Sequence, residues 1–182
     1  ILYLRRPDNA DSPPPDSYLN DNTNGFDGRC RWLLLGNGAA AGAFADLDGN
    51  GYQDAIICGT SNGANFAALD AIIYYGSEHG YATRTAVHLP TYQSKSVTVL
   101  DCNADGLPDL VFAQGDNPGL LIYFNTPQGF TPSNKREIGC AAVSHTVATD
   151  FDHDGSVDLA VLSDGRLLVF YSSGSGLPDS PD

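Results

Sequence analysis

The chain has 182 residues and a formal net charge of −13 at pH 7. Glycine is abundant, methionine is absent and only two glutamates occur, a composition that disfavours helices and indicates an all-β fold. The acidity and the lack of a basic stripe argue against a nucleic-acid partner, and no apolar run is long enough to span a bilayer.

The first segment, residues 1–26, combines an apolar run at its start with a proline-rich loop and the doublet Tyr18-Leu19. The run lies about as far before this doublet as the apolar run 55–58 lies before Tyr74-Tyr75. We therefore expect residues 1–26 to form an incomplete unit of a repeat whose first strand and acidic loop lie outside this chain.

Three acidic loops of nine residues follow, beginning at Asp46, Asp101 and Asp150, and all three share the pattern D-x-[DN]-x-[DN]-G-x-x-D. Oxygens at positions 1, 3 and 5 can converge on one point, and glycine at position 6 allows a sharp turn. The carbonyl at position 7 and the carboxylate at position 9 complete a shell of oxygens, which hard cations prefer. The pattern predicts three Ca²⁺ sites.

The segment after each loop separates this chain from EF-hand proteins. An EF-hand needs a glutamate at position 12 and a helix beyond it. Position 12 is Ile57, Phe112 or Val161, and each loop leads into about four apolar residues that end at a turn signal, which predicts a strand.

The repeat extends beyond the loops. A glycine–aromatic pair ends 20 residues before each loop, and an aromatic or apolar doublet lies just before each pair. The loops are spaced by 55 and 49 residues, a distance typical of propeller blades. Each unit is predicted to hold four short strands: one before the loop, one after it, one with the doublet and one after the glycine–aromatic turn.

These motifs resemble the FG-GAP/VCBS repeats of integrin-α-like β-propellers, in which the calcium loop joins the first two strands of a blade. The resemblance implies β-propeller blades, each a four-stranded antiparallel repeat, and here a partial propeller. It implies calcium ligands from the side chains of Asp46, Asp48, Asn50 and Asp54, of Asp101, Asn103, Asp105 and Asp109, and of Asp150, Asp152, Asp154 and Asp158, with backbone carbonyls from Tyr52, Leu107 and Ser156.

The repeats divide the chain into four units. These are the partial blade at 1–26, calcium-binding repeats at 27–81 and 82–130, and a third repeat with a proline- and serine-rich end at 131–182. Fewer blades than a closed ring needs would leave strand edges and an apolar face exposed. We therefore expect further blades or a neighbouring subunit to complete the fold.

The acidic loops indicate the compartment, and the compartment in turn bears on the four cysteines. Cytosolic free Ca²⁺ would leave weak sites of this kind empty, so the loops predict an extracellular or cell-surface protein. In such a protein we expect two disulfides among Cys30, Cys58, Cys102 and Cys140, and the sequence leaves all three pairings open. Cys58, inside an apolar strand, could instead be a small buried residue.

Function is less specified than fold, because propellers host many activities. No catalytic motif occurs, and nearly every close pair of acids belongs to a loop, so we expect no enzyme. The favoured function is a module that binds a protein or glycan. The alternatives are a structural subunit of an extracellular filament or surface assembly, and an enzyme with an unrecognised site. We expect the aromatic doublets to pack between blades rather than to stack on sugars.

Overall fold

A computed structural model describes residues 34, 36, 38–60, 69–115 and 119–181. These residues form three antiparallel sheets and a single short 3-10 turn at Thr83–Thr85, so the predicted all-β fold is confirmed. The predicted partial blade at 1–26 lies outside the described residues. No helix in the described ranges is long and apolar enough to cross a membrane.

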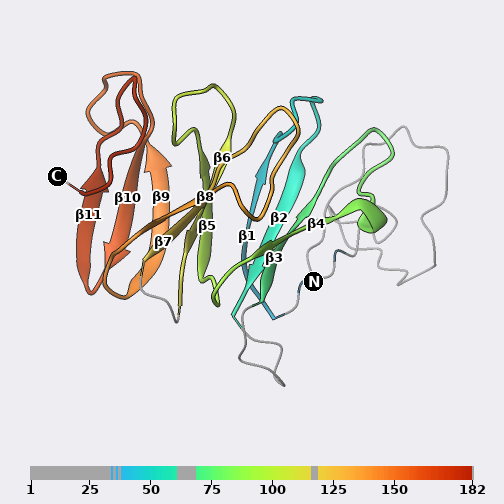
Figure 1. Cartoon of the computed structure of the whole chain (residues 1–182), viewed down its shortest axis with the longest axis horizontal. Coiled ribbons are helices and arrows are strands. Elements are labelled where there is room, and N and C mark those ends of the chain that lie inside the picture. Colours follow the sequence, from blue (N-terminus) through green and yellow to red (C-terminus); the bar gives the residue numbers. More distant parts are fainter. Residues whose placement is uncertain (1–33, 35, 37, 61–68, 116–118, 182) are drawn as a thin grey trace, which may run out of the picture.

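Each sheet is a meander in which consecutive strands pair antiparallel. The first sheet contains β1 (Ala39–Ala45), β2 (Asp54–Gly59), β3 (Asp70–Tyr74) and β4 (Val87–Pro90). The second contains β5 (Ser96–Leu100), β6 (Asp109–Ala113), β7 (Leu120–Tyr123) and β8 (Lys135–Ile138). The third contains β9 (Val143–Thr149), β10 (Asp158–Ser163) and β11 (Arg166–Phe170). Figure 1 shows the three sheets side by side in sequence order, as expected for blades of a partial propeller.

The acidic loops occupy the same place in every sheet, between the first and second strands. Asp54, Asp109 and Asp158, the ninth residues of the loops, are also the first residues of β2, β6 and β10. The predicted exit of each loop into a strand is therefore confirmed.

The sheets are offset by one strand from the repeat units of the sequence. The unit boundaries after residues 81 and 130 fall between the third and fourth strands of a sheet. β4 and β8 lie beyond these boundaries, yet they hydrogen-bond to β3 and β7. Each complete sheet therefore takes its outer strand from the start of the following sequence unit.

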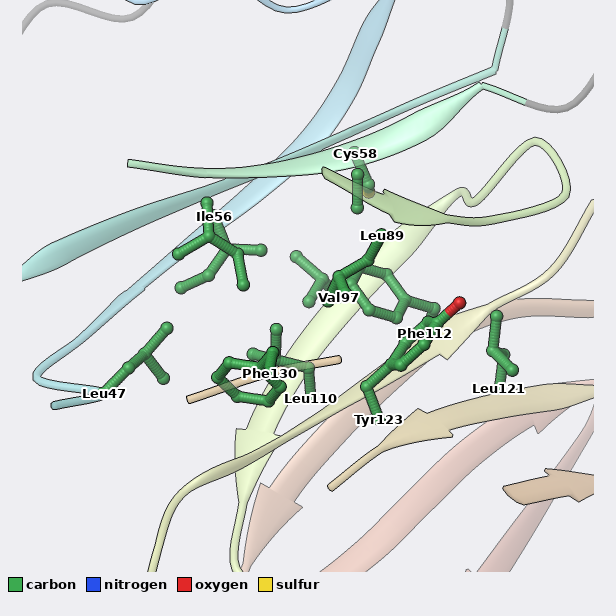
Figure 2. Close-up of a cluster of buried hydrophobic side chains, with 12 residues drawn as sticks. Leu47, Ile56, Cys58, Leu89, Val97, Leu110, Phe112, Leu121, Tyr123 and Phe130 are labelled. Carbon is green, nitrogen blue, oxygen red and sulfur yellow. The ribbon is translucent and has the colours of Figure 1, made fainter. Parts of the chain in front are cut away.

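The core lies between neighbouring sheets. Every residue of β2 and β6 is buried, as expected for short, continuous apolar runs covered on both faces. Figure 2 shows the cluster between the first two sheets, where Phe112 and Tyr123 meet edge to face with ring centroids 6.2 Å apart. A second cluster, which includes Val111, Leu159 and Phe170, fills the space between the second and third sheets.

The aromatic doublets pack largely as expected. Tyr74, Tyr123 and Phe170, the first residues of the doublets, are buried, and the Tyr123 hydroxyl donates a hydrogen bond of 2.6 Å to the Pro90 carbonyl. Tyr171 differs because its side chain is exposed. The doublets therefore serve mainly to pack the sheets.

The cysteines differ from the expectation of two disulfides. Cys58, Cys102 and Cys140 are free thiols, and Cys30 lies outside the described residues. Cys58 is part of the cluster between the first two sheets, whereas Cys102 is part of the cluster between the second and third. Burial raises the pKa of the Cys58 thiol to about 11 and also raises that of Cys102. These two residues act as small apolar side chains.

Candidate metal centres

The backbone of each loop turns through two left-handed residues. The glycines at position 6 have φ values of 86°, 86° and 93° (Gly51, Gly106 and Gly155). Position 4 is also left-handed, at 73°, 58° and 62° (Gly49, Ala104 and His153). The motif predicted the turn at position 6 but gave no sign of the one at position 4, because only the first loop has glycine there.

The carboxylate of the first aspartate in each loop accepts hydrogen bonds from backbone N–H groups of the same loop. Asp46 Oδ1 accepts from Asn50 N at 3.0 Å, and Asp46 Oδ2 accepts from Gly51 N at 2.8 Å. Asp101 accepts from positions 5 and 6 in the same way, at 3.2 and 2.8 Å. Asp150 accepts from His153 N at 2.7 Å and from Gly155 N at 3.1 Å.

The side chains at positions 3 and 5 continue this pattern. The position 3 oxygen accepts from the N–H of position 5 at 3.0–3.2 Å, and the position 5 oxygen accepts from the N–H of position 7 at 2.7–2.9 Å. The donors at position 7 are Tyr52, Leu107 and Ser156, whose N–H groups thereby fix the turn. These local bonds direct several side-chain oxygens toward the backbone of their own loop.

Two of the loops bring three carboxylates together. Oxygens of Asp46, Asp48 and Asp54 lie within 4.8 Å of one another, and so do oxygens of Asp150, Asp152 and Asp158. Two ligands of one Ca²⁺, each about 2.3–2.6 Å from the ion, are separated by at most about 5 Å, so this spacing and the oxygen-only donors fit the ion. Asp154, the expected ligand at position 5, lies outside its cluster.

The second loop has asparagine at position 3, so Asn103 replaces one carboxylate of the three-acid pattern. Its carbonyl oxygen accepts from Asp105 N at 3.0 Å, while its amide donates to Asp105 Oδ2 at 2.9 Å. In the first loop, Asn50 at position 5 donates to Asp48 Oδ2 at 3.1 Å and to the Gly76 carbonyl at 3.0 Å. The asparagines thus add donors inside loops that otherwise present acceptors.

The ninth aspartate has a structural role that the sequence analysis missed. Asp54, Asp109 and Asp158 are 0% exposed, and both oxygens of each accept backbone hydrogen bonds. One comes from the second residue of the same loop, at 2.7–2.9 Å. The other comes from the segment after the third strand, at 2.7–2.8 Å, where the donors are Gly76, Asn125 and Ser172. The sequence signal for this role was an aspartate at the start of an apolar strand, because a buried carboxylate requires hydrogen-bond donors.

The electrostatics of Asp54 and Asp109 favour a cation. Burial raises the pKa of Asp54, and the nearby Asp48 and Asp46 charges add to the rise, although two backbone hydrogen bonds oppose it. Burial, with smaller contributions from Asp105 and Asp101, raises the pKa of Asp109 to about 6 against the same kind of opposing bonds. A bound divalent cation would offset both the cost of burying these charges and the smaller repulsion between them.

Comparison with known protein families supports the repeat. Residues 101–161 match the family described as an FG-GAP-like repeat. The match begins at the first residue of the second loop and ends within β10, so it includes the second and third loops. No curated protein matches the chain. Residues 101–161 are thus similar to an FG-GAP-like repeat, and the antiparallel sheets of the described residues are compatible with blades of a partial propeller.

Proposed function

We propose that this protein is a calcium-stabilised propeller module that acts outside the cell and binds a protein or glycan partner. The observation that supports calcium most directly is the clustering of three carboxylates in two equivalent loops. FG-GAP-like repeats in all-β folds are typical of binding modules without catalytic activity, which supports a non-enzymatic function.

Calcium would be held by the oxygens at positions 1, 3, 5, 7 and 9 of each loop, and it would supply positive charge where carboxylates crowd. Extracellular modules typically have a Kd of about 10⁻⁴ to 10⁻³ M. With about 1 mM free Ca²⁺ and a Kd of about 0.1 mM, each site would contribute about 1.4 kcal/mol, and three would contribute roughly 4 kcal/mol. A typical domain has about 5–15 kcal/mol of stability, so this share is large.

Thermal unfolding with and without chelator tests the calcium proposal. We expect excess chelator to lower Tm strongly and added Ca²⁺ to restore it, while the same concentration of Mg²⁺ restores less because Mg²⁺ prefers a tighter octahedral shell. A melting curve that chelation leaves unchanged would contradict the proposal.

The proposal of a binding function is supported by exposed aromatic side chains on and beside the loops. Tyr52 belongs to the first loop, Phe151 to the third, and Phe44 lies near the end of β1; all three are exposed. Exposed rings beside bound cations are suited to sugar or protein surfaces. A glycan array with calcium, repeated with Tyr52→Ala, tests the glycan form; uniform absence of binding would leave a protein as the partner.

The second candidate function is a structural subunit of an extracellular assembly. It is favoured by exposed apolar residues on one face of the third sheet, among them Val147, Leu162 and Leu167. Sedimentation velocity at increasing concentration tests it. Assembly that Leu167→Lys abolishes would support this candidate, and a stable monomer at all concentrations would contradict it.

A further inference from the structure

The second residue of each loop lies at a junction between neighbouring sheets. In the first loop, Leu47 N donates to Asp54 Oδ2 at 2.7 Å, so the peptide before it belongs to the candidate metal centre. The Leu47 carbonyl faces the second sheet and accepts from Asn125 Nδ2 at 2.8 Å. This bond joins residues 78 positions apart and is buried.

Asn125 contacts two loops at once. Its backbone N–H donates to Asp109 Oδ1 of the second loop at 2.8 Å, while its side chain reaches the Leu47 carbonyl of the first loop. The residue is itself buried. A single buried residue therefore lies between the ninth carboxylate of the second loop and the second residue of the first loop.

The second and third loops are joined in an equivalent way by the turn after β11. Ser172 N donates to Asp158 Oδ1 at 2.7 Å, and five residues later Leu177 N donates to the Cys102 carbonyl at 2.8 Å. Cys102 N in turn donates to Asp109 Oδ2 at 2.9 Å. The turn between these contacts is closed by hydrogen bonds between Ser173 and Gly176.

Hydrogen bonds, together with the covalent turn from Ser172 to Leu177, therefore connect all three loops. From Asp158 it passes along the turn to Cys102, then through Asp109 and Asn125 to Leu47, and ends at Asp54. Because buried hydrogen bonds are strong and directional, a shift of one ninth carboxylate would be transmitted to the second residue of the preceding loop.

We propose that Asn125 is a positioning residue that couples calcium binding in the first two loops, although it is not itself a ligand. This inference rests on the proposed calcium function. Calcium in the second loop fixes Asp109, Asp109 fixes Asn125, and Asn125 holds Leu47 and hence the first loop in the binding conformation. By thermodynamic linkage, calcium in the first loop favours binding in the second by the same factor.

Calcium titration of the full chain, followed by ¹H–¹⁵N NMR, tests the coupling loop by loop. The amides of Gly51, Gly106 and Gly155 each donate to the first aspartate of their own loop, so each reports one site. Asp101→Ala removes a second-loop ligand without touching Asn125. We expect it to weaken calcium binding at Gly51 about fivefold, at the lower end of typical coupling factors.

The reciprocal variant, Asp46→Ala, should weaken binding at Gly106 by the same factor. In an Asn125→Ala background, Asp101→Ala should no longer affect Gly51. Thr126→Val is the matched control, because the Thr126 hydroxyl donates at 2.8 Å to the Gly129 carbonyl within the same connection and takes no part in the hydrogen bonds between the loops. This control should leave the coupling intact.

Asn125→Leu keeps the approximate size of the side chain and the backbone bond to Asp109 but removes the donor to Leu47 without burying a charge, so it serves if Asn125→Ala fails to fold. If the calcium-binding midpoint reported by Gly51 is the same with and without Asp101→Ala, the coupling is refuted but the proposed calcium function is not. Glycine amides that do not respond to calcium in the unmodified chain would overturn the proposed calcium function itself.

Discussion

The second and third loops have the same motif but different surroundings. Cys102, the second residue of its loop, is 1% exposed, whereas the equivalent Phe151 is 41% exposed. The turn at Ser173–Gly176 covers Cys102, and no segment within the described ranges takes the same place over Phe151. A loop of this repeat is therefore completed by the sheet that follows it in sequence.

The second and third sheets also differ in the burial of equivalent apolar residues. Val111 and Ala113 of β6 and Leu120 and Ile122 of β7 are buried against the third sheet. The residues at the same register positions in the third sheet are Ala160, Leu162, Leu167 and Val169. Of these, Leu162 and Leu167 are exposed and Val169 is half-buried, whereas the small Ala160 is buried. The large apolar side chains at these positions are therefore fully buried only where a neighbouring sheet covers them.

The largest expected effect comes from truncating equivalent leucines in the two sheets. Leu120 is 1% exposed and Leu167 is 66% exposed. Leu120→Ala should lower the free energy of unfolding by about 2–5 kcal/mol, because it leaves a cavity in a packed core. Leu167→Ala should change it by less than about 0.5 kcal/mol, as is usual for surface positions. Chemical denaturation in calcium buffer measures both, and equal losses would mean that the third sheet is also covered in solution.

The next effect concerns the turn that covers the second loop. A Cβ added at Gly176 would lie 2.4 Å from the Cys102 carbonyl oxygen, at a φ of 92°. Gly176→Ala should therefore cost about 2 kcal/mol or more, since the left-handed backbone alone costs about 1–2 kcal/mol. Gly174→Ala is the control, because a Cβ there meets no atom within 4 Å. If both variants melt at the same temperature, the turn does not dock on Cys102 in solution.

A third comparison separates ligands from neighbours inside the third loop. Asp152 belongs to the carboxylate cluster, while the adjacent His153 is exposed and contributes its backbone N–H to Asp150. Asp152→Ala should weaken calcium binding and remove most of the site's contribution of about 1.4 kcal/mol. His153→Ala should do little. Calorimetric titration of both variants checks this, and comparable losses of calcium affinity would refute the assigned ligands.

The smallest expected effect concerns the left-handed backbone at position 4, which does not depend on neighbouring sheets. Ala104 and His153 occupy left-handed position 4, where the first loop has Gly49. Ala104→Gly and His153→Gly should each raise stability by up to about 1 kcal/mol, because relief of the left-handed strain exceeds the added chain entropy. Similar gains in both loops would show that this strain is local, whereas a loss in either would argue against the left-handed conformation there.

The sequence by itself determined the class of fold and the positions of the loops. Oxygen-bearing residues at fixed spacing, glycine at position 6 and a short apolar run after each loop are local features, so they specify the turn and the following strand without reference to the rest of the chain. The burial of Tyr74, Tyr123 and Phe170 also followed from their recurrence at one place in the repeat.

Only the tertiary structure decided which residues at equivalent positions of the repeat differ in burial. The motif does not distinguish Cys102 from Phe151 as loop positions, or Leu120 from Leu167 as strand positions, because their burial depends on a neighbouring sheet. The expectation of two disulfides was also not met, because Cys58, Cys102 and Cys140 are free thiols and packing places Cys58 and Cys102 in different clusters. The two roles of the ninth aspartate and the position of Asn125 between two loops arise from contacts across sheets, which no local pattern encodes.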